Sequence, residues 1–313
     1  MKHEAAQRAL QEGAHTGLFG TIASVGEAYS LSRKDGYARL FTWLVRRAKE
    51  YYDTKPTTYG GPWGMDSDFM IHKVIPAWDD VEESTAITPE EQLETSKILF
   101  QWVQETAVGE ASGPVGTEHV RHNHQTFPGL GLLYAGDYFT RHYNAGEARR
   151  WTQIADDLFG LQVKAFKPHE DCNGYQWLTL YHTMQYALAK PDFAFFDNGN
   201  ARRCADYAVL CMDNLGYQVT YGDTGAFTGW WSEMPFLRGA LWYYRDARYA
   251  WALDKKHKVS GRAAVGEYAV DVEGQEPTDL VRSIAWPLDP YYYKSQGGPG
   301  RVPEPNAVDK VVF

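Results

Sequence analysis

The chain has 313 residues, of which 44% are hydrophobic and 23% are charged, so it can bury a sizeable core and lacks the composition of a disordered protein. A formal net charge of −9 argues against nucleic acid and anionic membranes as main partners, and no apolar run is long enough to span a bilayer. Its 3 cysteines make no disulfide framework, and we expect Cys204 and Cys211 to be buried free thiols rather than a pair.

Helical periodicity dominates the N-terminal part of the chain. Residues 27–52 are predicted to form one helix, and the Gly-rich aromatic stretch 57–70 is predicted to be a loop. The run Thr88-Pro89-Glu90-Glu91 combines an N-cap residue, a proline at the first helical position and acids in the first turn. It predicts a helix that runs to about Glu105, and the small residues of 107–118 predict a loop after it.

Three later helices share one pattern, because each follows a polar, Gly-containing loop and opens with aromatic residues. They are expected to begin near Phe127, Tyr175 and Trp230, and helices with one polar face, at 145–166 and 198–215, separate them. The alternation repeats roughly every fifty residues, as in stacked helical hairpins. It predicts an all-α fold, a complete or incomplete α/α toroid in which the starts of the inner helices meet at one mouth. An ordinary helical bundle is the alternative.

The composition changes after about residue 258. Prolines, glycines and the run Tyr291-Tyr292-Tyr293 predict loops and short strands for residues 259–313, and the final DKVVF has the pattern of a strand. We therefore expect a catalytic toroid domain over residues 1–258 and a loop and strand segment over 259–313, which favours the start of a β-rich domain there.

Two polar segments stand directly before predicted inner helices. The first, Arg121-His122-Asn123-His124-Gln125-Thr126, puts a run of polar residues beside a helix start, where they are costly to bury without a purpose. The second runs from His169 to Tyr175 and includes Glu170 and Asp171. Tyr175 follows His124 by 51 residues (175 minus 124), so a hairpin repeat of that period would place both at the same height on neighbouring inner helices.

The acidic chain has a locally basic stretch around these segments. Between residues 119 and 150 four arginines (Arg121, Arg141, Arg149 and Arg150) stand against two acids, and six of the 10 histidines lie between His119 and His182. A basic site within an acidic protein fits a negatively charged ligand.

These residue types fit β-elimination at a uronic acid. The proton to be removed lies α to a carboxylate, so an enzyme must neutralise that carboxylate to stabilise an enolate-like transition state. Asn123 and His124 are proposed for this role. Tyr175 is the proposed acid and base, since nearby cations such as His169 and the Arg121 region would lower its pKa from about 10.

The same residues resemble a known group of enzymes. An Asn-His pair before an aromatic helix, followed about fifty residues later by a Tyr at another helix start, is similar to the α/α-toroid polysaccharide lyases, the alginate and heparinase II/III-like lyases. Tyr221-Gly222-Asp223-Thr224-Gly225 resembles a Gly-Asp-Thr loop of the heparinase-like members, and VDKVVF resembles the first strand of their β-sandwich. The resemblance covers roughly residues 90–313 and implies that Asn123 neutralises the uronate, His124 assists or acts as base, and Tyr175 is the acid or acid/base.

The chain departs from these lyases in two places. Many of them carry an Arg shortly before the catalytic Tyr, where this chain has His169 and Glu170. Some use a distant second His as base, but the one His after residue 182 is His257, in the Lys-rich run DKKHK. The second departure favours a mechanism with Tyr175 alone, or with His124 as the base.

Further residues are expected to contact substrate. The predicted polar contacts are Arg121, His122, Gln125, His169, Glu170, His182 and Tyr221. Trp63, Trp230 and Trp231 are proposed as sugar platforms, because aromatic faces stack on sugar rings, although each taken singly also fits core packing. The expected partner is an acidic polysaccharide or oligosaccharide, and the sequence leaves the oligomeric state open.

Other interpretations of the same residues remain. His119, His122 and His124 have the chemistry to bind zinc, but nothing at typical spacing completes the set, so we predict no metal ion and no cofactor. A toroid glycoside hydrolase, including an unsaturated glucuronyl hydrolase, would use paired carboxylates, with Asp223 or Glu233 joining Glu170. A non-catalytic glycan-binding protein is the third interpretation.

The expected location is periplasmic or extracellular in the parent protein. The cytoplasm is the alternative, because residues 1–10 carry no secretory signal.

Overall fold

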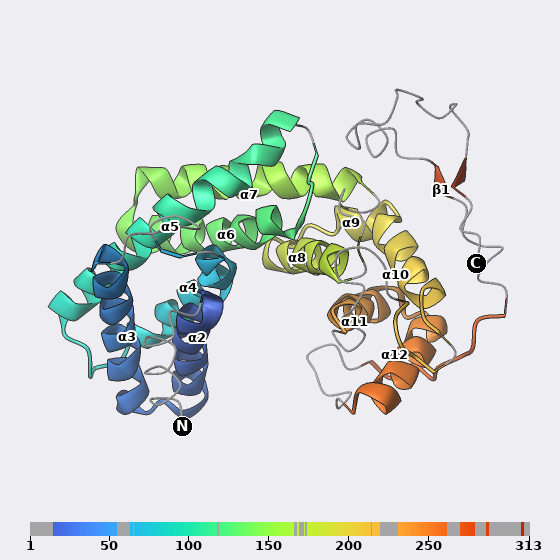
Figure 1. Ribbon diagram of the computed structural model, residues 1–313, viewed down its shortest axis with the longest axis horizontal. Helices are drawn as coiled ribbons and strands as arrows, with labels where there is room; N and C mark the ends of the chain where they lie inside the picture. The colour runs from blue at the N-terminus through green and yellow to red at the C-terminus, as the bar shows by residue number, and fades with distance from the viewer. Residues whose placement is uncertain are drawn as a thin grey trace. The chain divides into compact units, whose positions relative to one another are not determined.

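Helices make up almost all of the regular structure in the computed structural model of the chain (Figure 1). The structure describes residues 15–54, 63–64, 66–117, 119–165, 168, 172, 174–213, 215–219, 231–261, 270–278, 286–287 and 308–309. Within them, one short antiparallel strand pair occurs, between β1 (Trp286–Pro287) and β2 (Val308–Asp309). The predicted all-α class is confirmed, and the toroid arrangement stays a prediction.

The chain divides into two compact units. Unit 1 comprises residues 1–116 and 124–159, and unit 2 comprises residues 117–123 and 160–313. The sequence analysis assigns residues 1–258 to one domain, and the boundary between the two units falls within this range. The assignment of residues 1–258 to one domain stays a prediction.

The described part of unit 1 begins with a helical pair, α2 (His15–Ser32) and α3 (Asp35–Thr54). The single helix predicted over residues 27–52 is wrong, because the chain reverses at Arg33, whose φ is 51° and whose N–H still bonds the Tyr29 carbonyl at 2.7 Å. The reversal lets α2 pack against α3, and α2 also packs against α4 (Ile71–Val81). The short 3₁₀ helix η1 (Ser67–Met70) leads directly into α4.

The helix predicted from Pro89 is confirmed, but its end is not. A reciprocal cap joins Thr88 and Glu91, with backbone N–H to side-chain distances of 3.0 and 3.3 Å. The helix, α5 (Pro89–Thr117), continues through the loop predicted at 107–118. It continues because Val103, Ala107 and Ala111, spaced one turn apart, are all buried and extend one apolar face.

The next two helices form a tight hairpin. They are α6 (Asn123–Tyr143) and α7 (Gly146–Lys164), and the second confirms the helix predicted at 145–166. A Cβ at Gly136 of α6 would lie 2.9 Å from the carbonyl oxygen of Ala148, so the two backbones approach closely only because this residue is glycine.

Unit 2 is built from five helices among its described residues. They are α8 (Tyr175–Ala189), α9 (Ala194–Asp197), α10 (Asn200–Leu210), α11 (Glu233–Tyr244) and α12 (Ala247–Ser260). α11 packs against α8, α10 and α12. The helix predicted from Trp230 to beyond Tyr244 is interrupted at Arg245, whose φ is 53°, and Asp246 caps α12 by accepting the Arg248 N–H at 3.0 Å.

Aromatic side chains fill much of both cores. The largest fully buried side chains include Trp78, Trp102 and Trp151 in unit 1 and Trp177 in unit 2. In unit 1, Phe19 stacks on Trp102 with ring centroids 4.1 Å apart. Packing therefore explains a large share of the aromatic content. The three cysteines are buried and form no disulfide, which confirms the prediction for Cys204 and Cys211. None of the helices in the described ranges is long and apolar enough to cross a membrane.

Candidate functional site

The first predicted polar segment forms the start of α6 rather than a loop before it. Asn123 is the first helical residue, so Asn123 to Thr126 make up the first turn. Asn123, Gln125 and Thr126 are buried, with 2%, 7% and 0% of their surface exposed. Arg121 is exposed and His122 is half-buried. Burial of three polar side chains in one turn at a helix start, where the backbone N–H groups also lack helical partners, makes this turn suited to a negatively charged group.

His124 belongs to unit 1, where it contacts Asp66, just before η1, and Phe69 within η1. Its Nδ1 lies 3.5 Å from Oδ1 of Asp66, and its ring meets the ring of Phe69 edge-on, with centroids 4.8 Å apart. Asp66 has a φ of 60°, an uncommon backbone conformation for a residue other than glycine. The carboxylate before η1 and the aromatic ring within it therefore lie against the exposed imidazole of His124.

A buried carboxyl lies on the same 3₁₀ helix. Asp68 is 9% exposed, and burial, with a smaller contribution from Asp66 and Glu110, raises its pKa to about 7. His72, on the next turn, is also buried, and desolvation with help from Lys73 lowers its pKa to about 3. No sequence pattern singles out Asp68, because its burial depends on tertiary packing.

The second predicted segment leads into α8. Tyr175 is the first residue of the helix, as predicted, and is half-buried; its backbone N–H lies 3.4 Å from Cys172 Sγ. Ser232, just before α11, donates a hydrogen bond of 2.8 Å to the Gly174 carbonyl. These two bonds fix the start of α8 within unit 2.

One side of α8 carries polar groups into the interior. Gln176, Thr179, His182 and Thr183 are all at most 2% exposed. Tyr175 and His182, seven residues apart, share a helix face, as expected from their spacing. The start of α8 thus combines a half-buried phenol with a buried polar face.

The predicted triad is divided between the two units. Asn123 and Tyr175 both belong to unit 2, whereas His124 belongs to unit 1. Convergence of the three side chains stays a prediction. Other predicted residues lie outside the described residues, namely His169, Glu170, Asp171, Tyr221, Asp223 and Trp230.

Two of the predicted sugar platforms are core residues. Trp63 is 2% exposed, packs against Phe19 and Tyr52, and donates a hydrogen bond of 2.6 Å to Glu105. Trp231 is 8% exposed, with Tyr217 against its ring at 5.5 Å. Neither indole is open to a sugar in this conformation, so the structure corrects the platform assignment in favour of packing.

The predicted basic stretch separates into two parts along α6. Arg141 follows His124 by 17 residues, or about 25 Å of helix. Arg141 is paired with Asp79 at 2.7 Å and with Asp137 at 3.3 Å, and its guanidinium is thereby neutralised. The expectation of one basic field around the predicted site is therefore wrong for Arg141.

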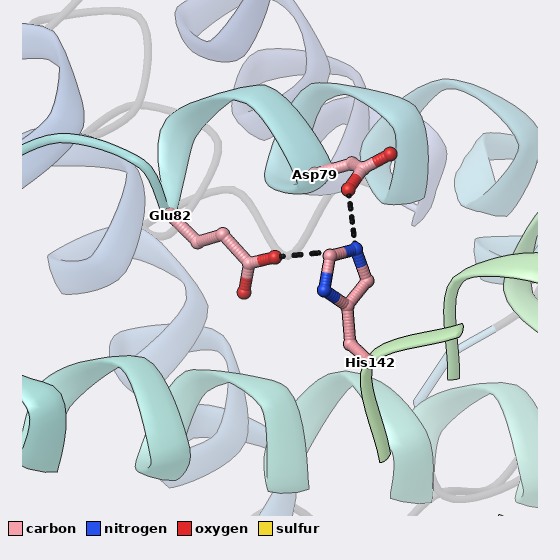
Figure 2. Close-up of side chains that lie close together, drawn as sticks. All are labelled: Asp79, Glu82 and His142. Carbon is pink, nitrogen blue, oxygen red and sulfur yellow. Dashed lines mark hydrogen bonds and ion pairs between the residues drawn. The ribbon is translucent and has the colours of Figure 1, made fainter. Parts of the chain in front are cut away.

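A cluster that the sequence did not suggest occupies the C-terminal end of α6. Asp79 and Glu82, at the end of α4, face His142 of α6 (Figure 2). His142 Nε2 lies 2.9 Å from Asp79 Oδ1 and 3.8 Å from Glu82 Oε1. The spacing of the two acids, i and i+3, places them on one helix face, but nothing in the sequence indicates that a histidine sixty-odd residues later joins them.

Comparison of the chain with protein-family models, curated proteins and solved structures gives no match. The resemblance to toroid lyases thus depends on short sequence motifs alone, chiefly Asn123, His124 and Tyr175. Any function for the chain has to be inferred from the chemistry of its own residues.

Proposed function

We propose that the chain is a polysaccharide lyase that cleaves a uronate-containing polysaccharide, of alginate, glucuronan or heparinoid type, by β-elimination. The observation that carries the proposal is the buried amide of Asn123 at a helix start, in the same compact unit as the half-buried phenol of Tyr175 at another helix start. A buried amide and the first N–H groups of α6 are donors suited to a substrate carboxylate.

The chemistry assigns one task to each group. Asn123, helped by His124, would hydrogen-bond the uronate carboxylate and stabilise the negative charge that develops when the C5 proton leaves. Tyr175, as phenolate, would accept that proton and, as phenol, donate one to the departing O4. The C4–O4 bond breaks as the C4–C5 double bond forms, so the step needs no water and no redox partner.

One assay tests the proposal. Purified protein is incubated with alginate, glucuronan and heparinoid substrates, and the ultraviolet absorbance of the 4,5-unsaturated uronate is followed together with reducing ends. A lyase raises both signals on at least one substrate. Absorbance that stays flat on all of these substrates, at enzyme concentrations that give full occupancy, argues against the proposal.

A second candidate, a glycoside hydrolase, is favoured by Asp68. A carboxyl with a pKa of about 7 is about half protonated at neutral pH and suits a general acid, and Asp66 supplies a second, more exposed carboxyl near His124. In the same assay an ordinary hydrolase raises reducing ends without absorbance, and an unsaturated glucuronyl hydrolase removes the absorbance of an unsaturated substrate. A glycan-binding protein changes neither signal.

A further inference from the structure

Three potential ligand atoms converge where α4 ends against the last turn of α6. They come from Asp79, Glu82 and His142, one atom from each, and they all lie within 4.8 Å of one another (Figure 2). Asp79 and His142 approach to 2.9 Å, and Glu82 and His142 to 3.8 Å. Ligands at 2.0–2.2 Å from a tetrahedral zinc ion are separated from one another by roughly 3.4 Å. The observed separations bracket that value, so small side-chain movements would bring all three atoms into contact with one ion.

The other oxygen of each carboxylate is already held by a donor. Arg141 donates to Asp79 Oδ2 at 2.7 Å, and the Tyr138 hydroxyl donates to Glu82 Oε2 at 2.5 Å. These bonds orient the remaining oxygens, Oδ1 and Oε1, toward the imidazole. Donors behind the ligating atoms are characteristic of metal sites, where they fix the orientation of the ligands.

The charges of the group also favour a divalent cation. Asp79, Glu82 and Asp137 contribute three negative charges, and Arg141, which bonds two of these acids, contributes one positive charge. These four side chains together leave two negative charges. Glu82 is largely buried, with 15% of its side chain exposed, so this excess is only partly screened by water.

We propose that Asp79, Glu82 and His142 bind a divalent transition-metal ion of the zinc class. Imidazole nitrogen with two carboxylate oxygens suits Zn²⁺ better than Mg²⁺ or Ca²⁺, which prefer oxygen ligands throughout. His142 is 36% exposed, which leaves room for water in a fourth position. The ion would join the end of α4 to the end of α6. The proposal is independent of the lyase assignment, because the first turn of α6 does not contribute to it.

Zinc binding to chelator-treated protein tests the proposal. Thermal unfolding is followed with and without ZnCl₂, and calorimetry gives the Kd and the stoichiometry. We expect one Zn²⁺ per chain and a Tm rise of about 5 °C at a hundredfold excess over Kd. MgCl₂ at the same concentration should leave the Tm unchanged. No saturable zinc binding, or an equal effect of both salts, overturns the proposal.

Matched variants locate the ion. His142→Gln and Glu82→Gln should each weaken zinc binding at least tenfold, and Glu82→Gln keeps an acceptor for Tyr138, so the fold is preserved. His257→Gln, which changes a histidine of α12, should bind zinc like the wild type. Co²⁺ gives a second readout, because a tetrahedral site produces strong visible absorption that is lost in His142→Gln. The assignment is contradicted if wild type and His142→Gln bind zinc equally, or if only His257→Gln loses binding. His142 would then serve only as a direct partner of the two acids.

Discussion

Lys256 of α12 donates a hydrogen bond of 2.7 Å to Glu233 at the start of α11, and both side chains are removed from solvent, with 0% and 2% of their surface exposed. The same ammonium donates to Gln218 at 2.9 Å, so it joins three segments of unit 2. A buried charge pair is costly to form but more costly to break, because the remaining charge has no water to solvate it. Glu233 therefore acts as an anchor for the start of α11, and this pairing makes it a poor candidate for the second carboxylate of a hydrolase.

Lys256→Met is expected to lower the free energy of unfolding by about 3–5 kcal/mol, because it leaves the Glu233 carboxylate buried and unpaired. The double variant Lys256→Met with Glu233→Leu should recover most of that loss. Urea denaturation measures both. A double variant no more stable than Lys256→Met alone would show that the pair stabilises unit 2 beyond simple charge compensation.

Asp68 and His72 predict opposing pH dependences within unit 1. The pKa of Asp68 rises from 3.8 to about 7 on folding, so the folded state holds a proton that the unfolded chain has released, and stability falls as pH rises from about 4 to 7. The pKa of His72 drops from 6.5 to about 3, so the unfolded chain binds a proton that the folded state does not. Its contribution to stability rises as pH goes from about 3 to 6.5.

Single variants should separate these two contributions. Asp68→Asn leaves His72, and its unfolding free energy should rise with pH between about 4 and 6.5. His72→Gln leaves Asp68, and its unfolding free energy should fall over the same interval. Denaturation at several pH values gives both slopes. Parallel profiles for the two variants would contradict the assigned protonation states.

Gln162 of α7 is fully buried, and neither atom of its amide has a hydrogen-bond partner among the described residues. An unsatisfied buried amide costs about 1–3 kcal/mol. Gln162→Met keeps the side-chain length and removes the polar atoms, so the variant should be more stable by about 1 kcal/mol, as measured by urea denaturation. A loss of stability would indicate that a water molecule or a ligand satisfies the amide.

Tyr175→Phe should reduce lyase activity by about 10²- to 10⁴-fold, since it removes only the hydroxyl assigned to proton transfer. Tyr181→Phe, on the same helix, serves as the matched control and should retain activity. The decrease should be in kcat, because substrate contacts away from the hydroxyl are unchanged. Full activity in Tyr175→Phe would remove the residue from the mechanism and leave the fold untouched.

Local chemistry was enough to predict some parts of the structure. The start of α5 follows from the capping residues Thr88 and Glu91, and the start of α8 at Tyr175 follows from the preceding polar run. The reversal at Arg33 was missed because apolar periodicity continues across it, and one residue with a positive φ leaves no signal in that pattern. The loop predicted at 107–118 was wrong because small residues suit a buried helix face as well as a loop.

The candidate sites show a similar limit. Asn123 and Tyr175 were selectable because polar residues cluster beside them in the sequence. Asp68 and the group around His142 could not be selected from the sequence. The burial of Asp68 and the assembly of the group around His142 both depend on contacts between helices that are distant in the chain. Sequence patterns report local chemistry, whereas the desolvation that changes a pKa is a property of the folded state.

The length of α6 has a thermodynamic consequence. His124 and His142 stand near opposite ends of one helix, about 27 Å apart, and their ion pairs are with different acids, Asp66 and Asp79. Effects of substitutions at such separations usually add. A chain altered at both histidines should therefore show the sum of the two individual changes in folding free energy, so that each end of the helix can be engineered without readjusting the other.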